Sequence, residues 1–314
     1  MLLSGARTWS TFALFCRILP SAGQESVGVR ARPSQASRLE AMSSSWRNLN
    51  HPVVVVAFSG WNDAAEAASA ALDHLSDTYP TELLYTLDSE DYYDYQDTRP
   101  VIEEIDGKRE LIWPAIEFTV AHLPQRDLVL VSGPEPNLRW PSLCRTLTSA
   151  FRMIKPEAVV LLGAMLTDVP HTRLLPISGA ANSQALAERL KLADPDYEGP
   201  VGIIGVLADA CRALGRLKTI TLWASVPYYT APTPNPKATL GLLGYLEDIL
   251  GDPLELGDLP SKTRHWEERI TELVDEDPDL AAYIAELEEL ADEAESGTGD
   301  ALAAEFERYL RRIG

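Results

Sequence analysis

Short apolar runs recur along the chain, and most are followed by a turn and a helical pattern of apolar positions. The first run, Val53 to Phe58, lies between Pro52 and the Ser59–Gly60 turn. A β-branched run of this length is typical of a strand buried on both faces, as in parallel sheets. The predicted strands span residues 53–58, 82–87, 116–120, 127–132, 156–163, 201–206 and 219–226, with a hairpin over 101–113 around Asp106–Gly107.

Helical patterns alternate with these strands, at about 64–75, 141–154, 207–214 and 237–250. Asn62 or Asp63 would cap the first helix, with Glu66 as the second half of a capping box. Strands that alternate with helices over some 200 residues predict an α/β fold. We therefore expect three layers, with a mostly parallel sheet covered by helices on both faces.

The composition changes near both ends of the chain. Residues 264–314 hold 16 acidic and 5 basic side chains, a net charge of −11, and predict three helices at about 262–274, from Pro278 onwards, and near 302–310. Residues 1–41 carry five arginines against two glutamates, a net of +3. We predict a disordered extension or mis-assigned start over 1–45, a core domain over 46–253 and an acidic helical region over 254–314.

The overall charge narrows the function classes. A formal net charge of −20 argues against nucleic-acid and acidic-membrane partners, because phosphate groups are bound by clustered Lys and Arg. The three cysteines form no C-x-x-C pair and the five histidines show no metal-ligand spacing, so we expect neither a metal nor a cofactor. No apolar stretch is long enough to span a bilayer, and we expect a cytoplasmic protein with reduced cysteines.

Three polar clusters follow predicted strands, where open α/β sheets place ligands. Asn62 and Asp63 would hold a hydroxyl or ammonium group of a ligand, or serve only as helix caps. Asp168, His171 and Arg173 combine an acid, an imidazole and a guanidinium, which suits acid–base chemistry or the bracing of a proline-containing loop.

The remaining cluster is Glu135, Arg139 and Trp140. These residues would form a small polar site with an aromatic wall, or a loop held by an internal Glu135–Arg139 pair. Nucleophile signals are weak, since Ser132 lacks the G-x-S-x-G elbow and the chain has no phosphate-binding loop.

Several motifs in order resemble one known family. They are Gly60-Trp-Asn-Asp-Ala64, Asp94-Tyr-Gln-Asp-Thr-Arg-Pro100, Ser132-Gly-Pro-Glu-Pro-Asn-Leu-Arg-Trp140, Asp168-Val-Pro-His-Thr-Arg173, Val226-Pro-Tyr-Tyr229 and Pro234-Asn-Pro-Lys-Ala238. The chain resembles the proteasome assembly chaperone 2 family, in its bacterial branch, from about Asn48 onwards. That resemblance implies a fold similar to nucleoside phosphorylases and peptidyl-tRNA hydrolases, and proteasome subunits as partners.

We therefore expect a non-enzymatic, chaperone-like protein that binds copies of itself and protein partners. Some relatives dock on proteasomes through a tail with a penultimate tyrosine. Ile313 stands at that place here, so we do not expect this docking mode. The alternative is a small-molecule-binding protein or enzyme that uses the strand-end loops, including the ATP-dependent carboxylate-amine ligase that some labels of the family suggest.

Overall fold

The computed structural model describes residues 46, 48–88, 90–192, 198–231 and 234–297, with side chains up to residue 293. Seven strands form one sheet in the order β2-β5-β6-β1-β7-β9-β8. They span Thr81–Leu87 (β2), Ile116–His122 (β5), Asp127–Ser132 (β6), Val53–Val56 (β1), Val159–Thr167 (β7), Thr219–Pro227 (β9) and Ile177–Ala181 (β8). The four central strands β6, β1, β7 and β9 run parallel, whereas β2, β5 and β8 pair antiparallel at the sides.

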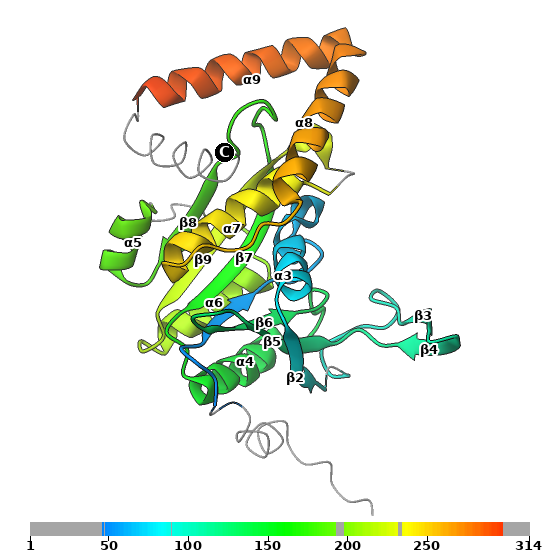
Figure 1. Ribbon diagram of the computed structural model, residues 1–314, viewed down its shortest axis with the longest axis vertical. Helices are drawn as coiled ribbons and strands as arrows, with labels where there is room; N and C mark the ends of the chain where they lie inside the picture. Colours follow the sequence, from blue (N-terminus) through cyan, green and yellow to red (C-terminus); the bar gives the residue numbers. More distant parts are fainter. Residues whose placement is uncertain (1–45, 47, 89, 193–197, 232–233, 298–314) are drawn as a thin grey trace, which may run out of the picture. The chain divides into compact units, whose positions relative to one another are not determined.

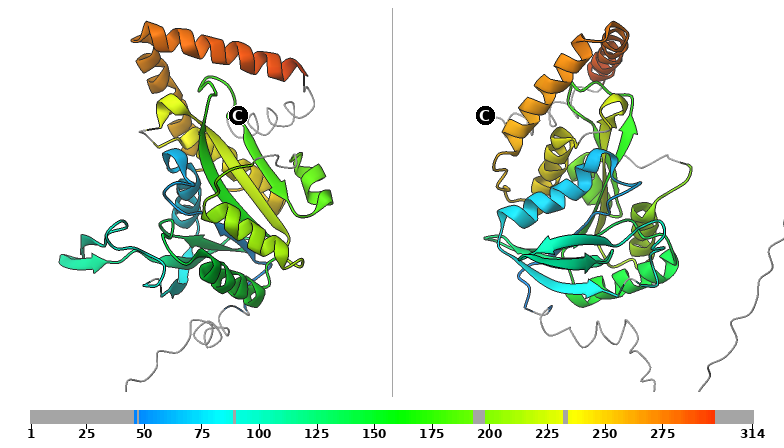
Figure 2. Two further views of the ribbon diagram at one scale, coloured as in Figure 1. Left: turned by 180° about the vertical axis from the view of Figure 1, so that it is seen from behind. Right: turned by 90° about the vertical axis from the view of Figure 1, so that its right-hand side faces the viewer.

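The alternation of side chains along β1 explains the three layers. Val53 and Val55 pack on one face of the sheet with α3 (Ala67–Thr78) and α7 (Pro236–Leu250). Val54 and Val56 pack on the other face with α4 (Trp140–Ile154) and α6 (Ile203–Ala213). Because successive strand residues point to opposite faces, an all-valine strand suits a sheet covered on both sides. Figures 1 and 2 show these helices on the two faces, and the predicted fold class is confirmed.

The start of α3 differs from the prediction. A 3₁₀ turn, η1 (Ala64–Glu66), follows β1, and both Ala65 (φ 51°) and Glu66 (φ 56°) adopt left-handed backbone conformations. The helix therefore begins only at Ala67, and the predicted capping box with Glu66 is wrong, since this residue precedes the helix. The buried alanines of α3 still let it approach the sheet closely, as expected.

Two other segments were mis-assigned or missed. The predicted strand over 201–206 is wrong, because α6 already begins at Ile203 and its apolar residues pack on the sheet. The short edge strand β8 and the following helix α5 (Gln184–Leu190) were not predicted. The hairpin is confirmed: β3 (Val101–Ile105) and β4 (Lys108–Ile112) form their own two-stranded sheet, with positive φ at Asp106 and Gly107.

Two of the three predicted C-terminal helices are present as α8 (Leu259–Asp275) and α9 (Pro278–Gly297). Leu254 and Leu259 belong to the same buried cluster as the central strands, so this region is packed against the sheet's helices. The helix predicted near 302–310 and the extension over 1–45 lie outside the described residues. Within the described part of the chain, no helix is both long and apolar enough to cross a membrane.

Candidate functional site

The carboxyl ends of β1 and β6 form the crevice in which an open α/β sheet usually binds ligands. The helix after β1 covers one face of the sheet and the helix after β6 covers the other, so the chain diverges here. Asn62 is fully buried in this crevice, and its Nδ2 donates to Glu135 Oε1 at 2.6 Å. The same carboxylate oxygen accepts the Ile203 N–H at 3.1 Å, at the positive end of α6.

The backbone at Gly202 lies directly against the Asn62 amide. A Cβ atom added at Gly202 would lie 2.0 Å from Asn62 Oδ1, so this N-cap position of α6 has room beside the amide only for glycine. Asn62 and Glu135, which belong to two separate clusters in the sequence analysis, are thus in contact. Their contacts join β1, β6 and α6, which is a bracing arrangement.

Asp63 caps α3 from a distance of four residues. Its carboxylate accepts the Ala68 N–H at 2.6 Å and the Ser69 hydroxyl at 2.5 Å, with the Ser69 N–H at 3.3 Å. Burial raises the pKa of Asp63 from its ordinary value, against the lowering effect of the hydrogen bonds from Ser69 and Ala68. These contacts correspond to the capping role that the sequence allowed.

Arg139 and Trp140 turn away from Glu135. Arg139 pairs with Asp91 at 3.1 Å, and both side chains are largely exposed. Trp140 Nε1 donates to the Pro136 carbonyl at 2.5 Å, which closes the loop in front of α4. The internal Glu135–Arg139 pair that was one interpretation of this loop is therefore wrong, because Glu135 is bound by Asn62 and α6.

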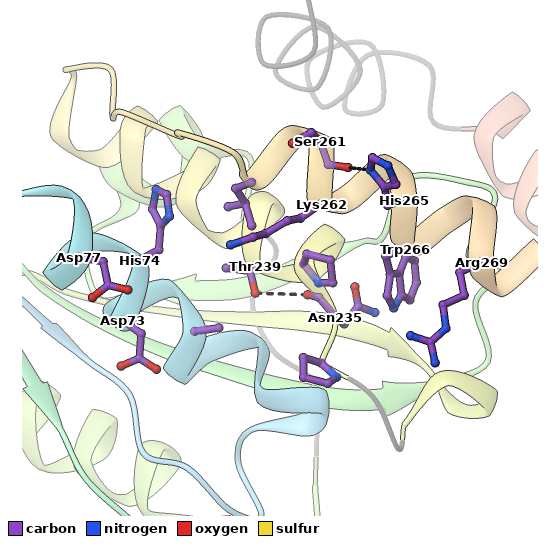
Figure 3. A pocket seen from close by; sticks show the side chains of 14 residues that line it. Asp73, His74, Asp77, Asn235, Thr239, Ser261, Lys262, His265, Trp266 and Arg269 are labelled. Carbon is purple, nitrogen blue, oxygen red and sulfur yellow. Dashed lines mark hydrogen bonds between the residues drawn. The ribbon is translucent and has the colours of Figure 1, made fainter.

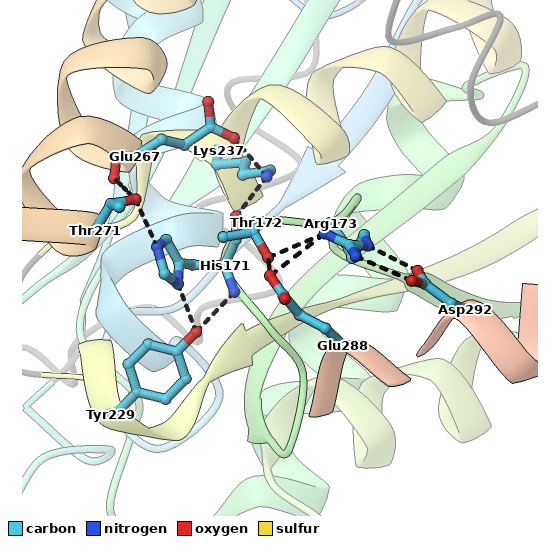
Figure 4. A network of polar contacts seen from close by, with 9 residues as sticks. All are labelled: His171, Thr172, Arg173, Tyr229, Lys237, Glu267, Thr271, Glu288 and Asp292. Carbon is cyan, nitrogen blue, oxygen red and sulfur yellow. Dashed lines mark hydrogen bonds and ion pairs between the residues drawn. The ribbon is translucent and has the colours of Figure 1, made fainter. Parts of the chain in front are cut away.

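His171 lies in the loop between β7 and β8 and is 1% exposed. Tyr229, in the 3₁₀ turn η2 (Tyr228–Thr230), accepts the His171 N–H at 2.7 Å and contacts His171 Nδ1 at 2.8 Å. His171 Nε2 lies 3.0 Å from Thr271 Oγ1, whose own proton is donated to the Glu267 carbonyl (Figure 4). Nε2 must therefore carry the proton, while Nδ1 accepts the Tyr229 hydroxyl proton.

This environment keeps the imidazole neutral. Burial and the nearby Lys237 ammonium lower the pKa of His171 to about 4, and burial raises the pKa of Tyr229 to about 12. No carboxylate contacts the ring in the described part of the chain, since Asp168 instead accepts the Tyr283 hydroxyl at 2.8 Å. The three candidate residues of this loop are thus not assembled as an acid–base pair.

The loop holds the acidic C-terminal helices. Arg173 forms a two-pronged pair with Asp292, at 2.8 and 3.0 Å, and also lies 3.3 Å from Glu288 (Figure 4). This contact lowers the pKa of Asp292. The buried Lys237 donates to the His171 carbonyl at 2.7 Å and pairs with Glu267 at 2.5 Å, which links the loop to α7 and α8. Burial lowers the pKa of Lys237, whereas Glu267 opposes that shift.

The candidate chemistry elsewhere is limited. Burial raises the pKa of Cys144 to about 11 and that of Cys211 to about 12, which makes both poor nucleophiles. Among the described residues, no group of three or more His, Cys, Asp or Glu side chains is arranged to hold a metal ion. A cavity of about 710 Å³ lies between α3, α7 and α8 (Figure 3), and none of the eight predicted site residues lines it.

Comparison with known proteins identifies the family. The sequence matches the model described as the PAC2 family over residues 57–274. The chain belongs to the PAC2 family. This span contains all eight predicted site residues and α8 except its last residue. It therefore includes most of the bracing network, by which we mean the contacts around Asn62, Glu135, His171 and Arg173.

Solved structures agree with this assignment. The chain is 46% identical to the Mycobacterium tuberculosis proteasome-assembly chaperone homologue Rv2125, over 74% of this chain and 99% of that one, with a TM-score of 0.68. A PAC2 family protein of Streptomyces avermitilis is 44% identical over the same shares, with a TM-score of 0.70. PbaB of Pyrococcus furiosus, an archaeal proteasome activator, shares the fold at 16% identity, with 72% and 94% covered and a TM-score of 0.59. No curated protein matches the chain.

Several residues of the bracing network in this PAC2 protein were not identified as candidates from the sequence. They are Tyr229, Lys237, Glu267, Thr271, Glu288 and Asp292. Tyr229 and Lys237 stand in motifs that carried the family resemblance, which was a usable signal. The acidic partners of Arg173 were hidden among 16 acidic residues of the C-terminal region, where nothing distinguishes one carboxylate from the next.

Proposed function

We propose that this PAC2 protein is a non-enzymatic, chaperone-like protein that assembles with copies of itself and binds protein partners, with proteasome subunits as the expected class. The relationship to a proteasome-assembly chaperone homologue at 46% identity supports the partner class. The polar residues at the strand ends support a binding role, because they contact one another and the backbone as braces.

The observation that carries the proposal is the β3–β4 hairpin. Val101, Ile102 and Leu111 are 51%, 59% and 50% exposed, and Figure 1 shows the hairpin apart from the seven-stranded sheet. Ile102 and Leu111 are cross-strand partners, so they form one exposed aliphatic pair, while Val101 points to the opposite face. A two-stranded hairpin is marginally stable in water alone, and exposed apolar surface of this kind marks interaction sites.

We expect this hairpin to be covered by a second copy of the chain. The double variant Ile102→Glu/Leu111→Glu should dissociate the wild-type oligomer to single chains, measured by size-exclusion chromatography with light scattering. Glu103→Gln/Glu110→Gln is the matched control, because it changes the adjacent cross-strand pair and leaves the aliphatic surface intact. A monomeric wild-type protein, or an oligomer unaffected by the two glutamates, would contradict this proposal.

The partner class is tested with the tagged wild-type protein as bait. We expect a native pull-down of the tagged wild-type protein from its own cells, followed by mass spectrometry, to recover proteasome α-subunits or half-assembled cores. Recovery of the protein alone with a retained metabolite would favour the alternative of a small-molecule site at the strand-end loops. That alternative, including carboxylate-amine ligase activity, stays a prediction from the sequence.

A further inference from the structure

Charge is distributed unevenly among the helices of this chain. Residues 139–155 and 203–218, which comprise α4, α6 and the residues next to them, hold seven Lys or Arg side chains and one Asp. Their net charge is +6 in a chain whose total is −20, and all seven cations are exposed. Residues 259–293 of α8 and α9 hold 12 acidic and 3 basic side chains, a net of −9. The molecule thus presents two charged surfaces of opposite sign.

Five of the cations lie at the carboxyl ends of α4 and α6, in a cluster that we call the basic end. They are Arg152, Lys155, Arg212, Arg216 and Lys218. The Val159 N–H donates to the Lys218 carbonyl at 2.8 Å, so the segments that follow the two helices run side by side. Among the described residues, Arg212 alone of these five forms an ion pair, with Asp209 at 3.5 Å.

Helix termini explain only part of the basic end. Arg152 and Arg212 lie in the last turns of α4 and α6, where a cation offsets the partial negative charge of the helix terminus. The neighbouring Glu157 is already paired with Arg126 at 3.1 Å and contacts His51 at 2.8 Å. The other three cations of the basic end are therefore an excess of exposed positive charge.

The complementary surface is the junction of α8 and α9, residues 272–279, which we call the acidic corner. Its five exposed carboxylates, with no basic residue among them, are Glu272, Asp275, Glu276, Asp277 and Asp279. The described ion pairs of α8 and α9 use other carboxylates, so these five have no Lys or Arg partner among the described residues. The side chain of Leu273 is 51% exposed beside them and offers an apolar contact.

The basic end and the acidic corner lie near opposite ends of β9. Lys218 directly precedes this strand, whereas Val274 of α8 packs in one cluster with Tyr229, which follows the strand. The nine residues of β9 span about 30 Å. The acidic corner of one chain is therefore placed to meet the basic end of another chain, and not its own.

We propose that the acidic corner of one copy of this PAC2 protein docks on the basic end of a second copy. Coulomb attraction between such surfaces speeds their encounter and fixes their orientation. A second copy is the favoured occupant because the chain itself carries the complementary charge, whereas a net charge of −20 repels nucleic acid. The two surfaces differ, so the contact joins copies head to tail. It involves no hairpin residue and does not depend on the hairpin contact proposed above.

The first measurement is sedimentation velocity of the full chain carrying Ile102→Glu/Leu111→Glu, which removes the hairpin contact. We expect this protein to self-associate at about 50 mM NaCl and to be a single chain at about 500 mM, because salt screens exposed charges. The hairpin test above is therefore run at about 500 mM NaCl, so the two contacts can fail independently. Single chains at about 50 mM NaCl, or equal association at both salt concentrations, would overturn the head-to-tail proposal.

Two neutralising variants in that background identify the surfaces. Arg216→Gln/Lys218→Gln removes two cations of the basic end, and Glu272→Gln/Glu276→Gln removes two carboxylates of the acidic corner. Each variant alone should self-associate about tenfold more weakly at about 50 mM NaCl. An equimolar mixture should form pairs with the affinity of the parent, because the intact corner of the first variant fits the intact basic end of the second. A mixture that associates no better than each variant alone would overturn the proposal.

Lys108→Gln/Arg109→Gln is the matched control, because it removes the same charge from exposed positions of the hairpin. It should self-associate as its parent does, and a loss equal to that of the basic-end variant would overturn the proposal as an effect of net charge. Melting temperatures confirm that each variant is folded. Fluorescence anisotropy with labelled poly-uridine tests the other class of occupant. RNA binding that is lost in Arg216→Gln/Lys218→Gln, without self-association of the parent, would assign the basic end to nucleic acid instead.

Discussion

Protonation of the buried His171 should lower the stability of the folded protein. Its pKa is about 4 in the folded protein, against an ordinary value of 6.5. Between these pH values the unfolded chain binds more protons, so the free energy of unfolding should fall as the pH falls from about 6.5 towards 4. His171 alone should change the free energy of unfolding by up to about 1.4 kcal/mol per pH unit. Urea unfolding at a series of pH values measures this dependence.

The variant His171→Gln isolates this contribution, since glutamine retains a donor and an acceptor but does not titrate. We expect it to be less stable than the wild type at pH 7 by about 1–3 kcal/mol, because the contacts with Tyr229 and Thr271 are disturbed. The difference should shrink as the pH falls towards 4. A difference that stays constant with pH would show that His171 does not titrate in this window.

Residue roles could be predicted from the sequence where the partners are local. Asp63 is a cap of the helix that begins four residues later, and its role was one of the two interpretations offered. His171 depends on Tyr229 and Thr271, which are 58 and 100 residues away. No spacing rule connects such positions, so the sequence could not distinguish a neutral brace from an acid–base group.

At the scale of elements, buried strands were predicted well because both of their faces are apolar. The same property explains the error over residues 201–206, since α6 is also apolar on most sides and a short apolar run has no clear period. The edge strand β8 was missed because Gly179 and the neighbouring alanines give no β-branched signal. Because Ala65 has a left-handed backbone conformation, α3 begins later in the chain than predicted. An alanine-rich sequence gives no sign of such a conformation.

The attachment of α9 is an element-scale consequence of Arg173. Arg173→Gln should remove the two-pronged contact with Asp292 and the contact with Glu288. We expect amide hydrogen exchange in α9 to become roughly threefold faster, because partly exposed ion pairs stabilise only modestly. Hydrogen exchange with mass spectrometry measures this for peptides of α9 and of the sheet separately.

Arg212→Gln provides the control, because it removes an exposed pair with Asp209 within α6 and leaves the β7–β8 loop untouched. Its α9 peptides should exchange as in the wild type. If α9 exchanges equally in Arg173→Gln and in the wild type, the apolar residues Ile284 and Leu287, which are buried on α9, hold the helix without the loop.

For the whole molecule, the question is whether residues 254–314 form a separate region, as the change in composition predicted. In the part of this region that the structure describes, apolar contacts and one ion pair join it to the helices that cover the sheet. Leu254 and Leu259 lie in the main buried cluster, and Glu267 neutralises the buried Lys237 of α7. An acidic composition thus coexists with apolar anchors that composition alone does not reveal.

We therefore expect a fragment that ends at Pro253 to be much less stable than the full chain. It would expose the surface that Leu254 and Leu259 cover, at about 1.5–3 kcal/mol for each leucine, and would leave Lys237 without its carboxylate. Losses of this size approach the total stability of many domains. Thermal unfolding followed by circular dichroism should show a lower melting temperature or no cooperative transition.

A second fragment that ends at Asp275 separates the two helices, since it keeps α8 and removes α9. We expect its melting temperature to lie between those of the first fragment and the full chain, because it keeps the core leucines and the Lys237–Glu267 pair but loses Ile284 and Leu287, which are buried on α9. If the first fragment, which ends at Pro253, melts like the full chain, the expectation stated for that fragment is contradicted. Such a result would show that the predicted boundary at 253–254 separates an independent core from a dispensable acidic region.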